Sequence, residues 1–471
     1  MLLKTKIICT LGPATDDDRI LRELIKEGMN VARFNFSHGD HAEQLGRLNA
    51  FKRIRSEFPY PIASILDTKG PEIRIKQFEG NSACLVEGQD FILHTQDVKG
   101  DSSGVSVTYP DLAHDLDPGA RILIDDGLIE LKVEEIEGDK LICRVITGGD
   151  LSNNKSINIP GTKISLPYMS QQDKDDILFG IEHNMDYIAA SFVRTKEDVL
   201  EVREFLAANQ GQKIGIIAKI ENQEGVDNAD EIIQASDGIM IARGDMGVEI
   251  PFENIPSIQK LLVRKGYSAG KRVIVATQML DSMIRNPRPT RAEATDVASA
   301  VYDGTSAIML SGETAVGKYP VESLVTMKKI AIKTEREIDY RKQFDENRFP
   351  MRNITDAISH ATCTTAHDLN MEAIITVTKS GHTARMVSKF RPDCPIIAAA
   401  IDTTVWRQLA LSWGVIPVMA EVKTSSDELF DHVAQRSLEV GALKSGDLVV
   451  ITGGIPLGVS GSTNILKVQS V

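Results

Sequence analysis

The sequence predicts an α/β protein built on a (β/α)₈ TIM barrel, with an inserted all-β lid domain and a C-terminal open-sheet α/β domain. Three observations lead to this fold class: eight short apolar runs, amphipathic segments between them, and two places where the alternation breaks. With 471 residues, of which 42% are hydrophobic and 25% charged, the chain has material for about two to four domains of ordinary size.

The apolar runs are rich in β-branched residues and are the expected barrel strands. They span residues 6–11, 30–36, 62–66, 187–192, 214–220, 238–242, 272–276 and 307–310. Leu, Ile, Glu and Lys recur at helical spacing in the segments between them, at 17–27, 171–183, 195–208, 255–269 and 321–337. Strand and helix that alternate in this way are typical of a (β/α)₈ barrel.

The first break lies between Gly70 and about Tyr168, where short runs alternate with turns such as 137–139. After about Tyr340, strands near 373–377, 395–400, 415–419 and 447–451 are separated by helical segments, which predicts an open α/β sheet. The polar stretch 345–354, which contains Pro350, is the expected connection. We therefore expect a barrel over 1–69 and 169–344, a lid over 70–168 and a third domain over 345–471.

The bulk composition excludes several classes of protein. A formal charge of −13 argues against a nucleic-acid binder, and no apolar stretch reaches the ~18 residues of a membrane helix. Residues 1–6 lack the basic-then-apolar order of a secretory signal, so we expect a cytoplasmic protein. The five cysteines include no C-x-x-C pair, which predicts reduced thiols and a metal held by carboxylates rather than by sulfur.

Barrel enzymes carry their catalytic groups at the carboxyl ends of the strands, so the polar residues that end each apolar run are the first candidates. Alternation along a strand places Arg33, Asn35 and Ser37 on one face. The same two-residue step aligns Lys219 with Glu221, so a cation and a carboxylate share one site.

A second carboxylate, Asp245, ends the next strand after Gly244, where glycine permits close approach of a ligand to the backbone. Two carboxylates from adjacent strands suit Mg²⁺. Taken alone, Lys219 and Glu221 could instead form a structural ion pair, and Asp67 with Thr68 could cap a helix. Their common position at strand ends favours a site.

Five segments closely resemble the pyruvate kinase family, in its compact bacterial form without an extra C-terminal domain. These segments are 35–39 (NFSHG), 66–74 (LDTKGPEIR), 219–222 (KIEN), 276–283 (ATQMLDSM) and 286–293 (NPRPTRAE). The resemblance spans essentially the whole chain. It implies glycolytic phosphoryl transfer from phosphoenolpyruvate to ADP, giving pyruvate and ATP, by a homotetramer with a C-terminal regulatory domain.

The resemblance also assigns roles in the barrel. It implies that Glu221 and Asp245 bind Mg²⁺ or Mn²⁺, and that Arg33, Lys219 and Gly244 contact the substrate. Lys219 then neutralises charge on the transferring phosphoryl group, while Thr277 organises a water that protonates the enolate. Cations aimed at the transferring group are the main requirement of phosphoryl transfer.

Further residues follow from the same resemblance. Asn35, Ser37, Asp67 and Thr68 match a K⁺ site, and Glu72 matches the K⁺-dependent members of the family. Nucleotide-side contacts are implied for Asn35, His38, Arg74 and Lys155, the last from the lid. By default, however, His38 would be a packed or solvated histidine and Lys155 a surface lysine.

The third domain offers an anion-binding arrangement between a strand and a helix start, with loop 453–461 positioned to close over it. The resemblance suggests a sugar bisphosphate or a nucleotide monophosphate as effector, and a plain helix cap is the alternative. The residues are Thr378, Lys379, Ser380, Gly381, His382 and Thr383.

Other functions remain to be weighed. A barrel lyase or aldolase would also use two carboxylates and an arginine, but the lid and Lys219 disfavour it. A catalytically silent metabolite-binding regulator is disfavoured by the intact Lys219, Glu221, Asp245 and Thr277. Residues 312–319 nearly match a Walker phosphate loop, but Tyr319 replaces the required hydroxyl, so a P-loop ATPase is rejected.

Overall fold

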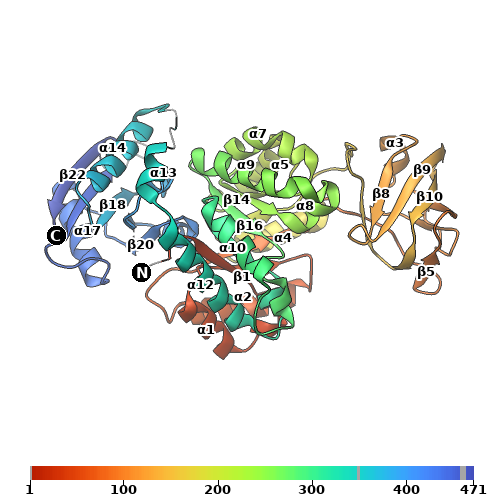
Figure 1. The fold of residues 1–471 in the computed structure, drawn as a ribbon, viewed down its shortest axis with the longest axis horizontal. Coiled ribbons are helices and arrows are strands. Elements are labelled where there is room, and N and C mark those ends of the chain that lie inside the picture. The colour runs from red at the N-terminus through yellow and green to blue at the C-terminus, as the bar shows by residue number, and fades with distance from the viewer. Residues whose placement is uncertain (1–2, 347–348, 350, 457–462) are drawn as a thin grey trace.

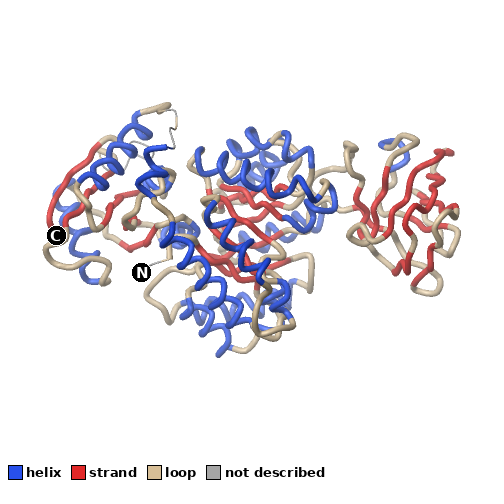
Figure 2. The backbone as a smooth tube through the Cα atoms, in the orientation of Figure 1, coloured by secondary structure: helices blue, strands red, loops and turns tan. Residues whose placement is uncertain are grey.

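The computed structural model describes residues 3–346, 349, 351–456 and 463–471, and it arranges them as three bodies in a row (Figure 1). A helix-wrapped closed barrel lies in the middle, a body of strands lies at one end, and an open sheet flanked by helices lies at the other (Figure 2). The predicted fold class is therefore confirmed.

Within the described chain, eight parallel strands close the barrel, and each of the predicted apolar runs supplies one. The register pair Lys6 and Ala307 joins the first strand to the last. The strands are β1 (Lys6–Thr10), β2 (Val31–Asn35), β3 (Ala63–Asp67), β13 (Tyr187–Ala190), β14 (Gly215–Ile220), β15 (Gly238–Ala242), β16 (Arg272–Ala276) and β17 (Ala307–Leu310).

Helices surround these strands, and the five predicted amphipathic segments are all helical. Several begin with a capping box, in which a Ser or Thr hydroxyl and an acidic side chain satisfy free amides, as at Ser170 and Thr195. The helices are α1 (Asp18–Glu27), α2 (His41–Arg55), α4 (Gln171–Glu182), α5 (Lys196–Ala208), α6 (Gln223–Asp227), α7 (Ala229–Ala235), α8 (Arg243–Glu249), α9 (Ile255–Ser268), α10 (Arg291–Tyr302), α11 (Gly312–Ala315) and α12 (Pro320–Glu337). The next helix, α13 (Tyr340–Glu346), packs instead on the C-terminal domain, where Phe344 contacts His360 and Phe390.

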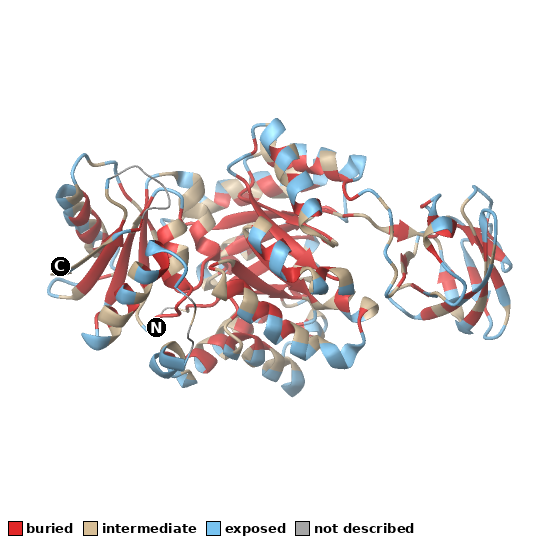
Figure 3. Cartoon of the chain, turned by 90° about the horizontal axis from the view of Figure 1, so that it is seen from above, coloured by how far each residue is buried: buried red, intermediate tan, exposed pale blue. Residues whose placement is uncertain are grey.

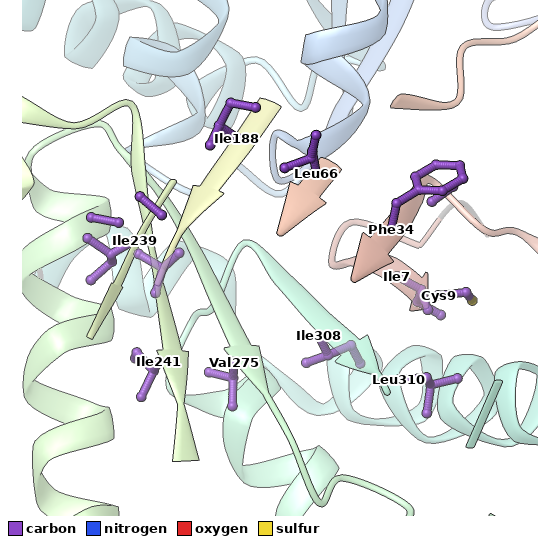
Figure 4. Packing of buried hydrophobic residues seen from close by; sticks show 14 of the residues in the cluster. Ile7, Cys9, Phe34, Leu66, Ile188, Ile239, Ile241, Val275, Ile308 and Leu310 are labelled. Atoms are coloured by element: carbon purple, nitrogen blue, oxygen red, sulfur yellow. The ribbon is translucent and has the colours of Figure 1, made fainter. Parts of the chain in front are cut away.

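Alternation along the barrel strands sorts side chains between two cores. Ile7, Phe34 and Ile188 point outward and pack against the helices (Figure 4), whereas Ile8 and Val31 belong to a smaller cluster inside the barrel. Figure 3 shows the buried strands at the centre of this body and the exposed faces of the helices around it. Because Arg33 follows Val31 by two residues on β2, its side chain lies on the same inward face of the strand.

The lid is inserted between β3 and β13. A seven-stranded sheet in the order β4-β12-β8-β9-β10-β6-β7 and a β11-β5 pair enclose their own apolar core. A short helix, α3 (Leu112–Asp115), accompanies them. The strands are β4 (Ile73–Arg74), β5 (Ser82–Leu85), β6 (Asp90–His94), β7 (Gly104–Ser106), β8 (Arg121–Ile124), β9 (Ile129–Glu137), β10 (Lys140–Thr147), β11 (Gly149–Ser152) and β12 (Ser156–Asn158).

The C-terminal sheet has the order β20-β19-β18-β21-β22, with helices packed on both faces. Its four predicted strands are present, and β22 adds an antiparallel edge that the sequence did not reveal. Most of the predicted loop 453–461, and part of the connection 345–354, lie outside the described residues. The elements are α14 (Ile354–Asp368), β18 (Ala373–Thr378), α15 (His382–Ser388), β19 (Ile396–Ala400), α16 (Thr403–Gln408), β20 (Val415–Met419), α17 (Ser426–Glu439), β21 (Leu448–Gly453) and β22 (Ile465–Ser470).

None of the helices in the described ranges is both long enough and apolar enough to cross a membrane.

Candidate active site in the barrel

A buried carboxylate, Asp67, holds two cationic side chains together at the carboxyl end of the barrel. Arg33 Nε donates to Asp67 Oδ2 at 2.6 Å, and Lys219 Nζ lies 3.1 Å from Asp67 Oδ1. Burial alone would raise the pKa of Asp67, but the two cations outweigh it and keep this pKa below its usual value. Thr10 Oγ1 accepts a further bond from Arg33, so the guanidinium is fixed on two sides.

Lys219 also reaches Glu221, as its position two residues earlier on the same strand predicts. Its Nζ lies 3.0 Å from Glu221 Oε1 and donates to Ser191 Oγ at 2.8 Å. Burial opposes the charge on Lys219, but Asp67 and Glu221 raise the pKa of this ammonium above its usual value. Lys219 is therefore a permanently charged group in a buried site.

Glu221 is fully buried and incompletely satisfied. Its Oε2 accepts from the backbone amide of Phe192 at 2.7 Å, whereas Oε1 accepts no well-aligned hydrogen bond despite its closeness to Lys219. Burial raises the pKa of Glu221 to about 8, because Lys219 only partly offsets it and the charge of Asp245 adds repulsion. The carboxylate is thus short of positive charge.

Gly244 and Asp245 lie in the first turn of the short helix α8, and Gly244 is hydrogen-bonded to the end of the next strand. The amide of Gly244 donates to Thr277 Oγ1 at 2.7 Å, and this hydroxyl donates to the carbonyl of Ala276 at 2.6 Å. Thr277 has a φ of 71°, an unfavourable conformation for a β-branched residue. The two hydrogen bonds of the hydroxyl help to hold Thr277 in this strained conformation, beside Gly244.

Arg243 and Asp296, which the sequence analysis did not single out, fix the backbone at Thr277. Arg243 forms a two-pronged pair with Asp296 at 2.6 and 2.7 Å, and its Nη2 donates to the carbonyl of Thr277 at 2.8 Å. Arg243 directly precedes the predicted Gly244 and Asp245, but nothing local indicated that its partner would come from a helix 53 positions later.

Ser191 is a third residue that the sequence analysis missed, although the sequence did carry a signal for it. It follows β13 as the polar end of a predicted apolar run, the same criterion that selected Lys219. Its hydroxyl contacts both Lys219 and Asp67, and Tyr168 donates to its carbonyl at 2.9 Å.

The donor set fits a divalent cation that completes its coordination with substrate or water. Among the described residues, no group of three or more His, Cys, Asp or Glu side chains is arranged to hold a metal ion unaided. Glu221 and Asp245 nevertheless supply two carboxylates, and the unsatisfied Oε1 of Glu221 with its raised pKa marks a place where positive charge is missing. Oxygen ligands of this kind suit Mg²⁺ or Mn²⁺.

The predicted K⁺ ligands lie on neighbouring strand ends but are not equally available. Asn35 and Asp67 are register partners on β2 and β3. Asn35 Oδ1 accepts from the amide of Ser37 at 3.2 Å, and Ser37 itself is exposed. Both Asp67 oxygens already bond cationic or hydroxyl groups, and Thr68 Oγ1 lies between the carbonyl of Ala189 and the amide of Ser191.

The residues expected on the nucleotide side lie around the barrel mouth and on the lid, but not together. His38 is exposed at the end of β2. Arg74 pairs with Glu72 at 2.8 Å, and Lys155 pairs with Asp125 at 2.8 Å, so both cations are held by lid neighbours.

A pocket of about 290 Å³ opens between lid and barrel, beside Asp245. Its walls come from both bodies, and they meet where Asn158 of the lid donates to Glu249 of α8 at 3.0 Å. This pocket is a space in which a substrate could contact Asp245 and the lid at once.

The predicted effector segment forms the turn from β18 into α15. Gly381 has a φ of 75°, which favours glycine there, and Arg385 donates to the carbonyl of Ser380 at 3.1 Å. The hydroxyls of Thr383 and Thr463, which lies just before β22, form a hydrogen bond at 2.8 Å. Thr378 is buried and Lys379 is exposed. His382 instead faces a separate pocket against the barrel.

Comparison with known families decides what this arrangement belongs to. A family model described as "Pyruvate kinase, barrel domain" matches residues 2–324. The chain belongs to the pyruvate kinase family. A second model, "Pyruvate kinase, alpha/beta domain", matches residues 356–469, so the family resemblance of the sequence is confirmed in both parts of the chain.

Individual relatives agree over the full length. A pyruvate kinase from Clostridium acetobutylicum is 51% identical over 470 residues, which are 99% of each chain. One from Geobacillus stearothermophilus is 50% identical over 474 residues, covering all of this chain and 81% of the relative. The solved structure of a pyruvate kinase from Cryptosporidium parvum superposes with a TM-score of 0.93 at 38% identity, covering 99% of this chain and 96% of the other.

Proposed function

We propose that this pyruvate kinase family member transfers the phosphoryl group of phosphoenolpyruvate to ADP, giving pyruvate and ATP, with Mg²⁺ or Mn²⁺ and with K⁺. The observation that carries the proposal is the buried set of Arg33, Asp67, Lys219 and Glu221 beside Asp245, in which cations and an unsatisfied carboxylate share one barrel mouth. Such a site suits a reaction that moves negative charge between bound phosphates.

Each side chain has a physical task in that reaction. Lys219 remains protonated, because Asp67, and Glu221 whenever it is ionised, favour its charge, and it can donate to the transferring group and to the forming enolate oxygen. Arg33 is kept in place by Asp67 and Thr10, so its orientation costs little when substrate binds. When bound at Glu221 and Asp245, Mg²⁺ would supply positive charge to the phosphoryl oxygens.

Thr277 is suited to hold a water on the carbon side of the enolate. The amide of Gly244 donates to its hydroxyl, and this leaves the hydroxyl's second lone pair for such a water. A hydroxyl is too weak an acid to protonate carbon directly near neutral pH, so we assign Thr277 to orienting the proton donor.

The lid and the C-terminal domain complete the proposal. We propose domain boundaries at 1–69 with 169–344, 70–168 and 345–471, nucleotide contacts through Asn35, His38, Arg74 and Lys155, and K⁺ binding at Asn35, Ser37, Asp67 and Thr68. An effector at 378–383, a homotetramer and a cytoplasmic location are further parts of it. Arg74 and Lys155 would have to exchange their present lid partners for phosphate oxygens.

The first test is pyruvate formation from phosphoenolpyruvate and ADP, with each cation added or withheld. We expect turnover that needs Mg²⁺ or Mn²⁺ and that rises when K⁺ replaces an equal concentration of a large organic cation. Turnover unchanged by K⁺ would remove the K⁺ site from the proposal. Consumption of phosphoenolpyruvate without ADP would favour the lyase hypothesis. Binding of phosphoenolpyruvate without any turnover would favour the hypothesis of a catalytically silent regulator.

A further inference from the structure

A second large pocket lies between the barrel and the C-terminal domain, far along the molecule from the lid. It has a volume of about 680 Å³, the size of sites that take small organic ligands. Helices α7 and α9 and the turn before β16 form the barrel wall, and the starts of α14 and α15 form the other wall. These two bodies lie side by side in Figure 1. We call this space the interdomain pocket.

The lining of the interdomain pocket is strongly basic, although the chain as a whole carries a net charge of −13. Its walls contain six Lys or Arg residues and three Asp residues. The six cations are Arg264, Lys265, Lys271, Arg352, Arg385 and Lys389.

All three carboxylates are already engaged. Asp230 pairs with Lys265 at 2.8 Å and Asp356 with Lys389 at 2.9 Å. Asp237 pairs with Arg203, which lies outside the lining, at 3.1 Å. In the part of the chain that the structure describes, the remaining four lining cations form no ion pair with a carboxylate.

Two of those four face each other from different domains and are partly buried. Lys271, in the turn that leads into β16, donates to the backbone carbonyls of Gln234 and Ser236, at 3.2 and 2.5 Å. Arg385 of α15 donates to the carbonyl of Ser380. Burial lowers the pKa of Lys271, and burial together with nearby Arg272 lowers the pKa of Arg385 to about 10. Asp237, which already pairs with Arg203, favours the charge on both cations, but burial outweighs it.

We propose that the interdomain pocket binds the phosphate group of a small phosphorylated metabolite, with Lys271 and Arg385 as its two anchors. A phosphate accepts several charge-assisted hydrogen bonds at once, and an arginine fork with a lysine is a common way to hold it. Arg264 and Arg352 are exposed at the rim and would attract the anion.

This site differs from the predicted effector turn and from the active site. The effector turn offers hydroxyls and amides at the start of α15, whereas the interdomain pocket is lined by His382, Arg385 and Lys389 along the flank of that helix. An occupant would contact the barrel and the C-terminal domain together. Lys271 stands just before β16, whose other end carries Thr277, so such an occupant would link the C-terminal domain to a strand of the active site.

The test is calorimetric titration of the full-length protein with inorganic phosphate and, separately, with ribose 5-phosphate, at constant ionic strength set by chloride. The key variant is Lys271→Gln, because glutamine keeps a donor for the two carbonyls and removes the charge. Lys265→Gln is the matched control, since that cation already has Asp230 as its partner. Lys379→Gln tests the effector turn.

We expect saturable binding that weakens about tenfold or more in Lys271→Gln, as for loss of a charge-assisted hydrogen bond. Lys265→Gln and Lys379→Gln should bind within about twofold of the parent chain, a change too small for the loss of a bonded charge. Equal binding by Lys271→Gln and the parent, or loss of binding in Lys379→Gln alone, would overturn the proposal. So would the absence of saturable binding to the parent protein. None of these readouts depends on turnover, so the proposed reaction is judged separately.

Discussion

Lys219 is the residue on which most of the barrel site depends. One ammonium group lies within 3.1 Å of two buried carboxylates and also donates to Ser191. Neither Asp67 nor Glu221 exposes its side chain to water, so both depend on protein partners for their charge. A change at Lys219 therefore acts on the chemistry and on the stability of the site together.

We expect Lys219→Met to lower turnover by about 10²-fold or more, with a modest effect on substrate binding, because charge stabilisation acts mainly in the transition state. The variant should also be less stable, since removing one member of a buried ion pair commonly costs ~3–5 kcal/mol. Steady-state kinetics and thermal unfolding measure the two effects. Near-normal turnover would contradict the role of Lys219, and Lys213→Met is a control at an exposed lysine before the same strand.

Glu221 makes the metal-free protein sensitive to pH. Its pKa is about 8 in the folded chain and near its ordinary value when unfolded, so between these values the folded state binds one more proton. Stability should therefore fall as pH rises from about 4.5 to about 8, in the absence of divalent ions. Mg²⁺ affinity should rise over the same range, because the metal competes with that proton.

Thermal midpoints measured across this range, with and without MgCl₂, check the prediction. Glu221→Gln should remove both the pH-dependent loss and most of the stabilisation by Mg²⁺. A parent protein whose metal-free midpoint rises steadily up to pH 8 would show that Glu221 is already ionised at lower pH.

At the scale of elements, the two connections to the lid meet at one carboxylate. Asp173, near the start of α4, accepts from the amide of Gly70 at 2.9 Å, where the chain leaves the barrel. It also accepts from the amide and the hydroxyl of Ser170, where the chain returns, at 3.0 and 2.6 Å. The base of the lid is thus anchored to a barrel helix rather than left as two free linkers.

Gly70→Ala should disturb the active site from this hinge. Gly70 has a φ of 76°, and a Cβ there would lie 2.8 Å from the Cβ of Ser191, whose hydroxyl holds Lys219. We expect a loss of turnover of about tenfold or more, because small displacements of catalytic groups are costly. Gly138→Ala is the matched control: its φ is 58° and nothing lies within 4 Å, so only the backbone strain is shared. Equal kinetics for the two variants would contradict this coupling.

The sequence predicts elements well where their apolar pattern is strong. All eight barrel strands come from runs of almost entirely buried residues, and Lys219 and Glu221 follow from alternation along one of them. The edge strand β22 was missed because its residues are only partly buried and include Lys467 and Gln469. Asp296 was missed for a different reason, since its role depends on a pairing with Arg243 that only the closed barrel creates.

At the scale of the whole molecule, the C-terminal domain is joined to the barrel by a buried ion pair. Arg407 Nε donates to Asp186 Oδ1 at 2.7 Å, and Asp186 is fully buried at the start of β13. Its other oxygen accepts from Ser64, and Arg55 is 3.6 Å away. A second pair across the same boundary, Lys213 with Asp402, is much more exposed.

Arg407→Ala should destabilise the protein by about 3 kcal/mol, because it leaves Asp186 buried without its nearest cation. Lys213→Ala, which removes the exposed pair, should cost about 1 kcal/mol or less. Since a chain with three bodies need not unfold in one step, the comparison is of thermal midpoints and of protease cleavage between barrel and C-terminal domain. Equal effects of the two changes would mean that Asp186 keeps enough compensation from Arg55 and Ser64.

The insertion of the lid between β3 and β13 also bears on how the chain is made. As residues leave the ribosome in order, the first three barrel strands appear, and then the entire lid, before β13 can pair with β3 through Leu66 and Ile188. Every strand pairing of the lid lies within the insertion, from the consecutive β8, β9 and β10 to the long-range pair of β4 with β12, so the lid can fold once its own residues have been made. The edge of β1 that pairs with β17 stays unpaired longest, because β17 is the last barrel strand to be synthesised. We expect the barrel to close only after the lid has folded, late in synthesis.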